Sequence, residues 1–443
     1  MLDYEYDYRF GFGSSTSIYG IPIFAGLLAG HKGGAAINSN PLMDLVNLSP
    51  AEQARRGLAY TPGEILQQPE LWTDTAARTA ACLAEIEKEL TSFLADPAAR
   101  IVLTGAGSSH FIGDSLAPSL GRAFGRVVMS VESTDIVTDP EILAAPGPLL
   151  MVSFARSGDS PESMGAYRLA AKAAPRLRQL IITCNEQGEL ARAARANGDL
   201  CLALDPRTND RGLAMTSSVT DLFLAGLGLA YAGRWGEYQR LAGDLSKAGE
   251  RLLTDMPHLI GEIVAAGFSR LVYLGSGPLY GAAREMALKI LEMTGGAIPS
   301  MARSYLGFRH GPMSFLNSGT FIVAMRSMDS YVRKYEDDLL AQLAAKGFAD
   351  RMLALEPQKA EGMRWRTLDL TGEGVTLPEA WLPALAVPVG QVLALLASLK
   401  LGRRPDQPSE DGLITRVVEG VVLYDREWSG GLPSGISLFT EPG

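Results

Sequence analysis

The length and the charge of the chain exclude several classes of protein. At 443 residues it exceeds the roughly 250 to 300 residues at which a single hydrophobic core stops growing, so two domains are expected. A net charge of −9 argues against nucleic acid as a partner, because a nucleic-acid surface needs a basic footprint. With 47% hydrophobic and 20% charged residues, the composition is that of a folded protein.

Residues 1–42 are expected to form an N-terminal tail, with Met43 as the natural start. Acidic residues stand where a signal peptide carries positive charge, and the apolar run at 21–29 is too short to cross a bilayer. Residues 43–95 then form a helical lead-in, since 63–95 has helical periodicity.

The chain contains a repeat with an offset of 170 residues, which predicts a duplicated domain. RIVLTGAG at 100–107 matches RLVYLGSG at 270–277, and ARSGDS at 155–160 matches MRSMDS at 325–330. In each copy an apolar run of strand length leads into a Gly-x-Gly turn and then a helical segment, which is typical of the first βα unit of a parallel sheet.

Further short apolar runs predict additional strands, at 148–154, 179–184, 199–204 and 320–325. Their alternation with helical stretches predicts an α/β fold of two tandem doubly wound, flavodoxin-like αβα domains after the lead-in. The expected limits are 96–235 for the first domain, 236–266 for a helical connector, 267–425 for the second domain and 426–443 for a C-terminal tail.

The apolar stretch at 381–399 is the other membrane suspect, but it contains Pro383 and Pro388. We expect a buried strand followed by a helix from about Gly390, and no transmembrane segment.

Three loops rich in serine and threonine lie at the predicted ends of elements in the first copy: GAGSSH (105–110), ARSGDSPES (155–163) and MTSSVT (215–220). Ligands of open parallel sheets bind at the carboxyl ends of strands, where hydroxyl and backbone N–H groups can hold an anion such as phosphate. Each such residue alone is as readily a helix N-cap, but three converging loops favour a phosphate site. The candidate substrate-binding residues in these loops are Gly107, Ser108, Ser109, Arg156, Ser157, Ser160, Ser217 and Ser218.

The repeat also differs at one informative position. The first copy has Gly158 where the second has Met328, so only the backbone of the first copy is expected to approach a ligand closely.

The second copy carries the candidates for proton transfer. Glu285, Lys289 and Glu292 are spaced by four and three, so they share one face of a predicted helix. Such a stripe is more often a solvated surface. His310 follows in the glycine- and proline-containing loop YLGFRHGP, and a carboxylate with an imidazole is suited to moving protons near neutral pH.

Other chemistries lack support. The metallohydrolase, calcium-loop, P-loop and nucleophile-elbow motifs do not occur, and GAGSSH lacks the third glycine of a dinucleotide fingerprint. The three cysteines, Cys82, Cys184 and Cys201, are scattered, which predicts neither a zinc site nor a disulfide framework and fits a reducing cytoplasm. No metal and no cofactor are expected.

In their order along the chain these motifs resemble the sugar isomerase (SIS) domain family, with two tandem SIS domains. The stretches LTGAGSSHFIGDSLAP, SFARSGDSPES, AMTSS, YLGSGPLYGAAREMALKILEMTGG and LGFRHGP are similar to bacterial galactosamine-6-phosphate deaminase/isomerases, long labelled tagatose-6-phosphate ketose/aldose isomerases. The similarity runs from about Met43 to Tyr424.

The resemblance implies a role for individual residues. Serines at family positions for the sugar phosphate are Ser109, Ser157, Ser160 and Ser217. Glu292 stands where the family keeps its C1/C2 proton-transfer carboxylate, His310 where it keeps the ring-opening histidine, and Lys289 where it has a lysine near the reacting sugar. A second lysine, found in the C-terminal loop of the related glucosamine-6-phosphate synthase, is replaced near Arg416, which is a further candidate substrate-binding residue.

The function implied is conversion of galactosamine 6-phosphate to tagatose 6-phosphate and ammonia. A homodimer or larger homo-oligomer is also implied, because in family relatives the histidine loop can reach the neighbouring subunit. Two alternatives stay open: an aldose/ketose 6-phosphate isomerase without deamination, and a non-catalytic sugar-phosphate sensor. A small sugar phosphate is the expected partner in each case.

Overall fold

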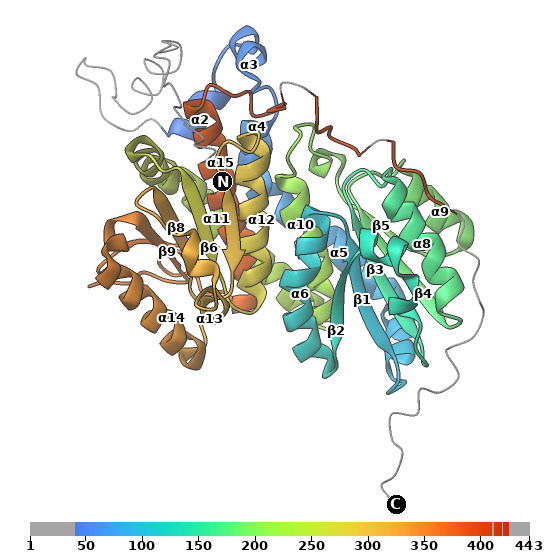
Figure 1. The fold of residues 1–443 in the computed structure, drawn as a ribbon. Helices are drawn as coiled ribbons and strands as arrows, with labels where there is room; N and C mark the ends of the chain where they lie inside the picture. The colour runs from blue at the N-terminus through green and yellow to red at the C-terminus, as the bar shows by residue number, and fades with distance from the viewer. Residues whose placement is uncertain (1–39, 410–411, 419, 425–443) are drawn as a thin grey trace, which may run out of the picture.

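The structure is a computed structural model that describes residues 40–409, 412–418 and 420–424 (Figure 1). The tails expected at 1–42 and 426–443 therefore lie almost wholly outside the described residues. Pro41 already belongs to the first helix, α2 (Pro41–Val46).

Ten strands and fourteen α-helices make up the described part of the chain. The strands are β1 Arg100–Gly105, β2 Val128–Glu132, β3 Leu149–Ala155, β4 Leu177–Thr183, β5 Leu200–Ala203, β6 Arg270–Leu274, β7 Ser300–Arg303, β8 Thr320–Met325, β9 Met352–Glu356 and β10 Arg366–Asp369. The helices after α2 are α3 Pro50–Arg56, α4 Thr61–Leu66, α5 Gln68–Leu94, α6 Ser108–Phe124, α7 Ser133–Thr138, α8 Pro161–Ala173, α9 Glu189–Asn197, α10 Ser217–Leu227, α11 Trp235–Ala266, α12 Pro278–Met293, α13 Tyr305–Phe308, α14 Ser330–Leu343 and α15 Leu382–Lys400.

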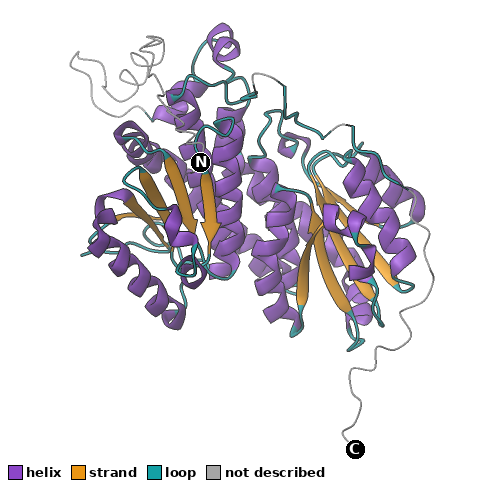
Figure 2. Ribbon diagram, in the orientation of Figure 1, coloured by secondary structure: helices purple, strands orange, loops and turns teal. Residues whose placement is uncertain are grey.

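The strands form two five-stranded parallel sheets with the same order. The first sheet runs β2-β1-β3-β4-β5 and the second runs β7-β6-β8-β9-β10, so each strand has a counterpart in the other sheet. The repeat of sequence is thus a repeat of topology, and the expected α/β fold is confirmed. In Figure 2 each sheet lies between layers of helices. We call residues 96–235 the first half and 267–425 the second half, and these limits stay a prediction.

Alternating side chains explain how each sheet is covered on both faces. In β1, Ile101 and Leu103 join the large core shared with α5 and α6, while Val102 joins a smaller core under α7 and α8. In β6, Tyr273 belongs to the shared core and Val272 to a core under α13 and α14. The shared core therefore lies between the two sheets, and it joins them.

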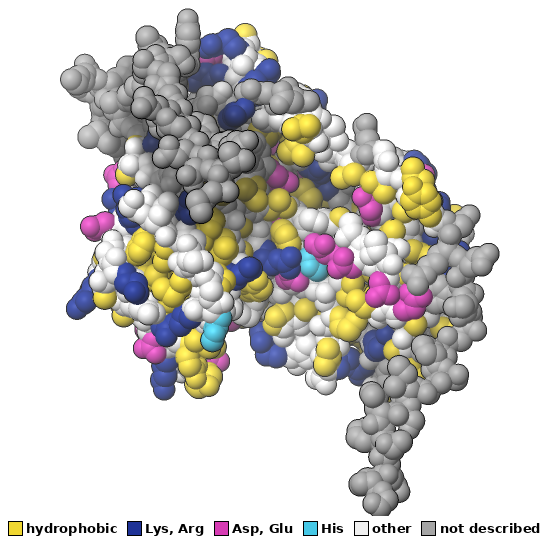
Figure 3. All heavy atoms as spheres, in the orientation of Figure 1, with side chains coloured by type: hydrophobic (Ala, Val, Ile, Leu, Met, Phe, Trp, Pro, Cys, Tyr) yellow, Lys and Arg dark blue, Asp and Glu magenta, His cyan; other side chains and the backbone are white. Residues whose placement is uncertain are grey.

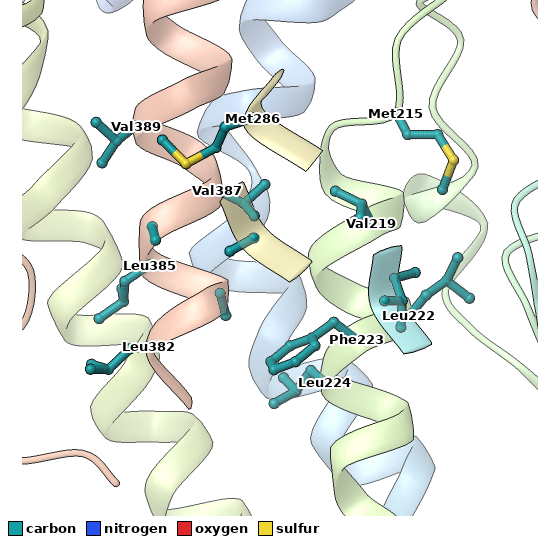
Figure 4. Close-up of a cluster of buried hydrophobic side chains, with 14 of the residues drawn as sticks. Met215, Val219, Leu222, Phe223, Leu224, Met286, Leu382, Leu385, Val387 and Val389 are labelled. Carbon is teal, nitrogen blue, oxygen red and sulfur yellow. The ribbon is translucent and has the colours of Figure 1, made fainter. Parts of the chain in front are cut away.

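The central layer consists of α5, α6, α10, α11, α12 and α15 (Figure 1). Figure 4 shows apolar side chains of α10, such as Val219 and Phe223, on one side of this layer and those of α12 and α15 on the other, with Val387 pointing toward Val219. The expected connector at 236–266 is helix α11, which packs against α5 and α15 as part of this layer.

The prediction of a strand before Gly390 was wrong, because α15 is one continuous helix. Pro383 occupies the first turn, where its missing N–H leaves no bond unmade, and Pro388 is held inside a helix buried on every side. By length and composition the segment Glu379–Lys400 could cross a membrane, but 94% of its apolar 18-residue stretch is buried inside the protein. It is a core helix.

Helices α6 and α12 follow the first strand of their halves, and they cross each other in opposite directions. Lys289, near the end of α12, reaches Ser108 at the start of α6, whereas Gly281 at the start of α12 meets Ser115 farther along α6. The carboxyl edges of the two sheets therefore face opposite ends of the molecule. Any site at the edge of the first sheet is completed by the end of α12 from the second half.

The seam between the halves also carries charges. Arg284 of α12 pairs with Asp114 of α6, and His110 Nε2 lies 3.5 Å from the Asp114 carboxylate. Figure 3 shows basic, acidic and histidine side chains together where the halves meet.

We expect Gly281→Ala to lower the free energy of unfolding by about 1 to 3 kcal/mol, the usual cost of overpacking a core. A Cβ on Gly281 would lie 2.2 Å from Ser115 Oγ and 2.5 Å from its backbone nitrogen. Urea unfolding followed by circular dichroism measures the change. The control is Gly63→Ala in α4, where a Cβ meets nothing within 4 Å. Equal stability of the two variants would contradict the close crossing.

Candidate active site

The three charged residues of α12 form a buried cluster at the helix crossing. Lys289 Nζ lies 3.3 Å from Glu285 Oε1, 2.5 Å from Glu292 Oε2 and 3.0 Å from Ser108 Oγ. The side chains of Lys289 and Glu285 are 0% and 2% exposed, whereas that of Glu292 is 23% exposed. Glu285, Lys289 and Glu292 thus lie at the interface between the halves rather than on a solvated surface. Glu292 is the member of this cluster that solvent reaches.

The electrostatics of this cluster keep Lys289 charged. Burial raises the pKa of Glu285, and the neighbouring ammonium of Lys289 only partly offsets this. Burial also opposes the charge of Lys289, but Glu285 and Glu292 outweigh it and raise the lysine pKa. Lys289 therefore remains an ammonium, and it pairs with the Glu292 carboxylate beside it.

The loop after β3 presents donors at the carboxyl edge of the first sheet. Ser157 Oγ accepts from Asp159 N at 3.3 Å, and Ser160 Oγ accepts from Ser163 N at 3.3 Å as the N-cap of α8. Within the described ranges, the hydroxyl proton of Ser157 and the N–H of Gly158 have no partner. Free donors beside a helix N-terminus are suited to an anion.

The loop after β1 lies beside the Lys289 cluster. Gly107, with φ 56°, is the residue just before α6, and its conformation is one that favours glycine. The Ser108 hydroxyl accepts a hydrogen bond from Lys289. The buried Ser109 hydroxyl donates weakly to Met215 Sδ at 3.9 Å. The backbone at the start of α6 is thus the part of this loop that can meet a ligand.

Two predicted substrate-binding serines are engaged inside the protein. Ser217 and Ser218 are fully buried, and each hydroxyl donates to the Asp210 carboxylate at 2.5 Å. The N–H groups of Thr216 and Ser218 also donate to Asp210. These hydroxyls anchor the loop that leads into α10. The sequence analysis missed Asp210, because nothing near it marks it as an anchor.

Arg156 and Arg416 fasten the C-terminal segment to the first half. The buried Arg156 donates to Arg416 O at 2.6 Å and to Leu213 O at 3.0 Å. Arg416 in turn donates to Asp210 O at 2.7 Å and to Asn209 Oδ1 at 2.6 Å. Both guanidinium groups thus hold protein oxygens around the site.

His310 does not meet Glu292 within one chain. It is exposed and follows α13, after β7, at the carboxyl edge of the second sheet. Glu292 lies fourteen residues along α12 from Pro278, about 21 Å at 1.5 Å per residue, toward the opposite end of the molecule. In Figure 1, α13 lies at the lower end of the second half, away from α4.

Glu64 of α4 is a further buried carboxyl that sequence reasoning missed, since it is 147 residues from the loop it binds. Its Oε1 accepts from Arg211 N at 2.5 Å. Burial, with Asp210 nearby, raises the Glu64 pKa to about 8. In the described part of the chain, no group of three or more His, Cys, Asp or Glu residues is arranged to hold a metal ion.

Comparison with known proteins gives consistent relatives. The SIS domain family matches residues 94–232. The D-galactosamine-6-phosphate deaminase AgaS of Shewanella sp. strain ANA-3 is 38% identical over 382 residues, covering 85% of this chain and 95% of that protein. The protein of the same name from Escherichia coli is 36% identical over 387 residues, with coverage of 85% and 98%.

A solved structure agrees with these relatives. The tagatose-6-phosphate ketose/aldose isomerase from Escherichia coli is 34% identical, with a TM-score of 0.76, and the match covers 83% of this chain and 97% of that chain.

We expect the stability of the protein to fall as the pH rises from about 4.5 to 8, relative to Glu64→Gln. In the unfolded chain Glu64 ionises near its ordinary value of 4.5, whereas in the folded protein it ionises near 8, so unfolding releases a proton in this window. The difference should exceed about 1 kcal/mol, since one pKa unit corresponds to about 1.4 kcal/mol. Urea unfolding at several pH values measures it.

Glu250→Gln, at an exposed position on α11, is the control and should follow the wild-type pH dependence. A Glu64→Gln curve parallel to the wild-type curve would contradict a neutral buried Glu64.

Proposed function

The chain belongs to the SIS domain family, in the group of the D-galactosamine-6-phosphate deaminases AgaS, and we propose that it converts galactosamine 6-phosphate and water to tagatose 6-phosphate and ammonia. One observation carries the proposal. The free donors of the first sheet's edge and the Lys289–Glu292 pair of the second half lie around the same start of α6.

The phosphate is received by the first half. Ser157 Oγ, Gly158 N and the capping region of Ser160 supply donors without net charge, and the starts of α6 and α8 add the positive ends of two helix dipoles. Holding this remote group fixes the other end of the sugar against α12, which lowers the entropic cost of reaction.

Glu292 acts as the proton-transfer base on the open-chain sugar. It takes the proton from C2 and delivers one to C1, through a neutral enolamine, and the product is an imine at C2. Water adds to this imine and ammonia leaves, giving the ketose. Lys289 holds the Glu292 carboxylate in place at 2.5 Å.

His310 opens the pyranose ring, and in this proposal it comes from a partner subunit. Within one chain it stands about the length of α12 away from Glu292. A homodimer or larger assembly that brings α13 of one subunit to the first half of another would complete the site.

The alternatives use the same geometry. An aldose/ketose isomerase needs the same transfer between C1 and C2 and releases no ammonia. A sensor would have no use for a partly exposed carboxylate paired with a buried lysine, so we favour an enzyme. The cytoplasmic location and the lack of a cofactor stay predictions.

We expect Glu292→Gln to lower turnover by roughly 10² to 10⁴-fold, the usual contribution of a general base. Affinity for galactosamine 6-phosphate should change little, because the phosphate donors are intact. Ammonia release measures turnover, and ligand-induced thermal shift measures binding. Glu250→Gln, exposed on α11, is the control with unchanged activity. Retained activity in Glu292→Gln would refute the role of this carboxylate.

A mixed assembly tests whether His310 acts across subunits. The Glu292→Gln and His310→Ala proteins should each be inactive, while a hybrid dimer carrying one of each should regain about half of the wild-type activity. One of its two sites then combines an intact Glu292 with an intact His310. Differently tagged, co-expressed subunits provide the hybrid. An inactive hybrid would contradict a shared site.

A further inference from the structure

The second half contains the counterpart of the phosphate-receiving loop, and a carboxylate of the chain occupies it. Glu379 begins the short helix Glu379–Trp381 that leads into α15. Its Oε2 accepts from Ser327 Oγ at 2.5 Å and from Met328 N at 2.5 Å. Both donors belong to the loop after β8, which repeats the loop after β3.

The two loops share the side-chain hydrogen bond of the first turn. Ser327 Oγ accepts from Asp329 N at 3.1 Å, as Ser157 Oγ accepts from Asp159 N at 3.3 Å. The hydroxyl proton and following N–H that are free in the first half are the two groups that bind Glu379 in the second. The carboxylate thus marks the position of an anion in this motif.

The start of α12 supports the same position. Gly277 (φ 54°, ψ −129°) and Gly107 (φ 56°, ψ −123°) have matching conformations just before α12 and α6. The second oxygen of Glu379, Oε1, lies 3.9 Å from where a Cβ on Gly277 would stand. The carboxylate is therefore close to the N-terminus of a sixteen-residue helix, whose dipole favours a negative charge.

The residues beneath this loop also interact with charged side chains of the second half. Glu336 Oε2 accepts from Ser327 N at 3.0 Å. Arg326, the counterpart of Arg156, is 1% exposed and faces Glu336, Asp337 and Glu356. The charge of Arg326 is neutralised by these carboxylates of the second half. Arg156, in contrast, donates to backbone carbonyl oxygens around the first site.

The backbone itself has diverged. Gly158 has φ 71°, and in the described ranges no residue other than glycine has a positive φ, so Met328 adopts a different conformation. This explains how a side chain is tolerated at that position. The loop lost the glycine but kept its hydroxyl and N–H donors.

We propose that the second half retains a phosphate-type anion site that Glu379 fills from within the chain. Each chain then has one open anion site, in the first half, and removing the Glu379 carboxylate reopens a second site that takes inorganic phosphate. This inference concerns anion binding alone and does not rest on the reaction proposed above.

The test counts phosphate sites per chain, by isothermal titration of wild type and Glu379→Ala with inorganic phosphate. We expect one additional equivalent in Glu379→Ala. Glu379→Gln should bind no more than wild type, because its amide oxygen can still accept both donors. Adding Ser327→Ala to Glu379→Ala should remove the gain.

An equal number of sites in wild type and Glu379→Ala would overturn the proposal, and so would an additional site in wild type at the second half. If Glu379→Ala does not fold in chloride, refolding in phosphate of the same ionic strength is decisive. Recovery in phosphate that is lost when Ser327→Ala is added supports the anion site, since phosphate also stabilises folded proteins in general; equal recovery of both variants, or failure in both salts, contradicts it.

Discussion

The buried contact of Lys289 with Glu285, Glu292 and Ser108 is the interaction on which the arrangement of this protein depends. An ammonium that is 0% exposed requires nearby negative charge, since a lone buried charge is very costly. Glu285 supplies that charge from one helical turn away, and Ser108 supplies a hydrogen-bond acceptor from the other half. One side chain thus couples the end of α12 to the start of α6.

That coupling explains how two similar halves make one site. The opposed directions of α6 and α12 bring Lys289 and Glu292, near the end of α12, to the carboxyl edge of the first sheet. At the opposite edge, that of the second sheet, the corresponding loop after β8 is bound by Glu379. Duplication of one fold explains why the two sheets have the same strand order. Later specialisation of each half explains why their carboxyl edges differ.

The sequence predicted those elements whose signals are local. Strand β8 was placed at its observed limits, and the repeat located both Gly-x-Gly turns, because apolar runs and turn glycines act over a few residues. The spacing of Glu285, Lys289 and Glu292 also predicted that they share one face of a helix. Their burial depends on contact with α6, which the sequence does not reveal. Helix α15 was misjudged because its prolines suggest a break, while burial on every side overrides that local preference. The attachments of Ser217 and Ser218 to Asp210, and the positions of Glu64 and Glu379, depend on contacts between distant segments that no local pattern encodes.

The proposal that the joined halves deaminate an amino sugar phosphate can be tested by product stoichiometry. With purified protein and galactosamine 6-phosphate, we expect ammonia and tagatose 6-phosphate in equal amounts. Conversion of galactose 6-phosphate to tagatose 6-phosphate, with galactosamine 6-phosphate left unchanged, would contradict it.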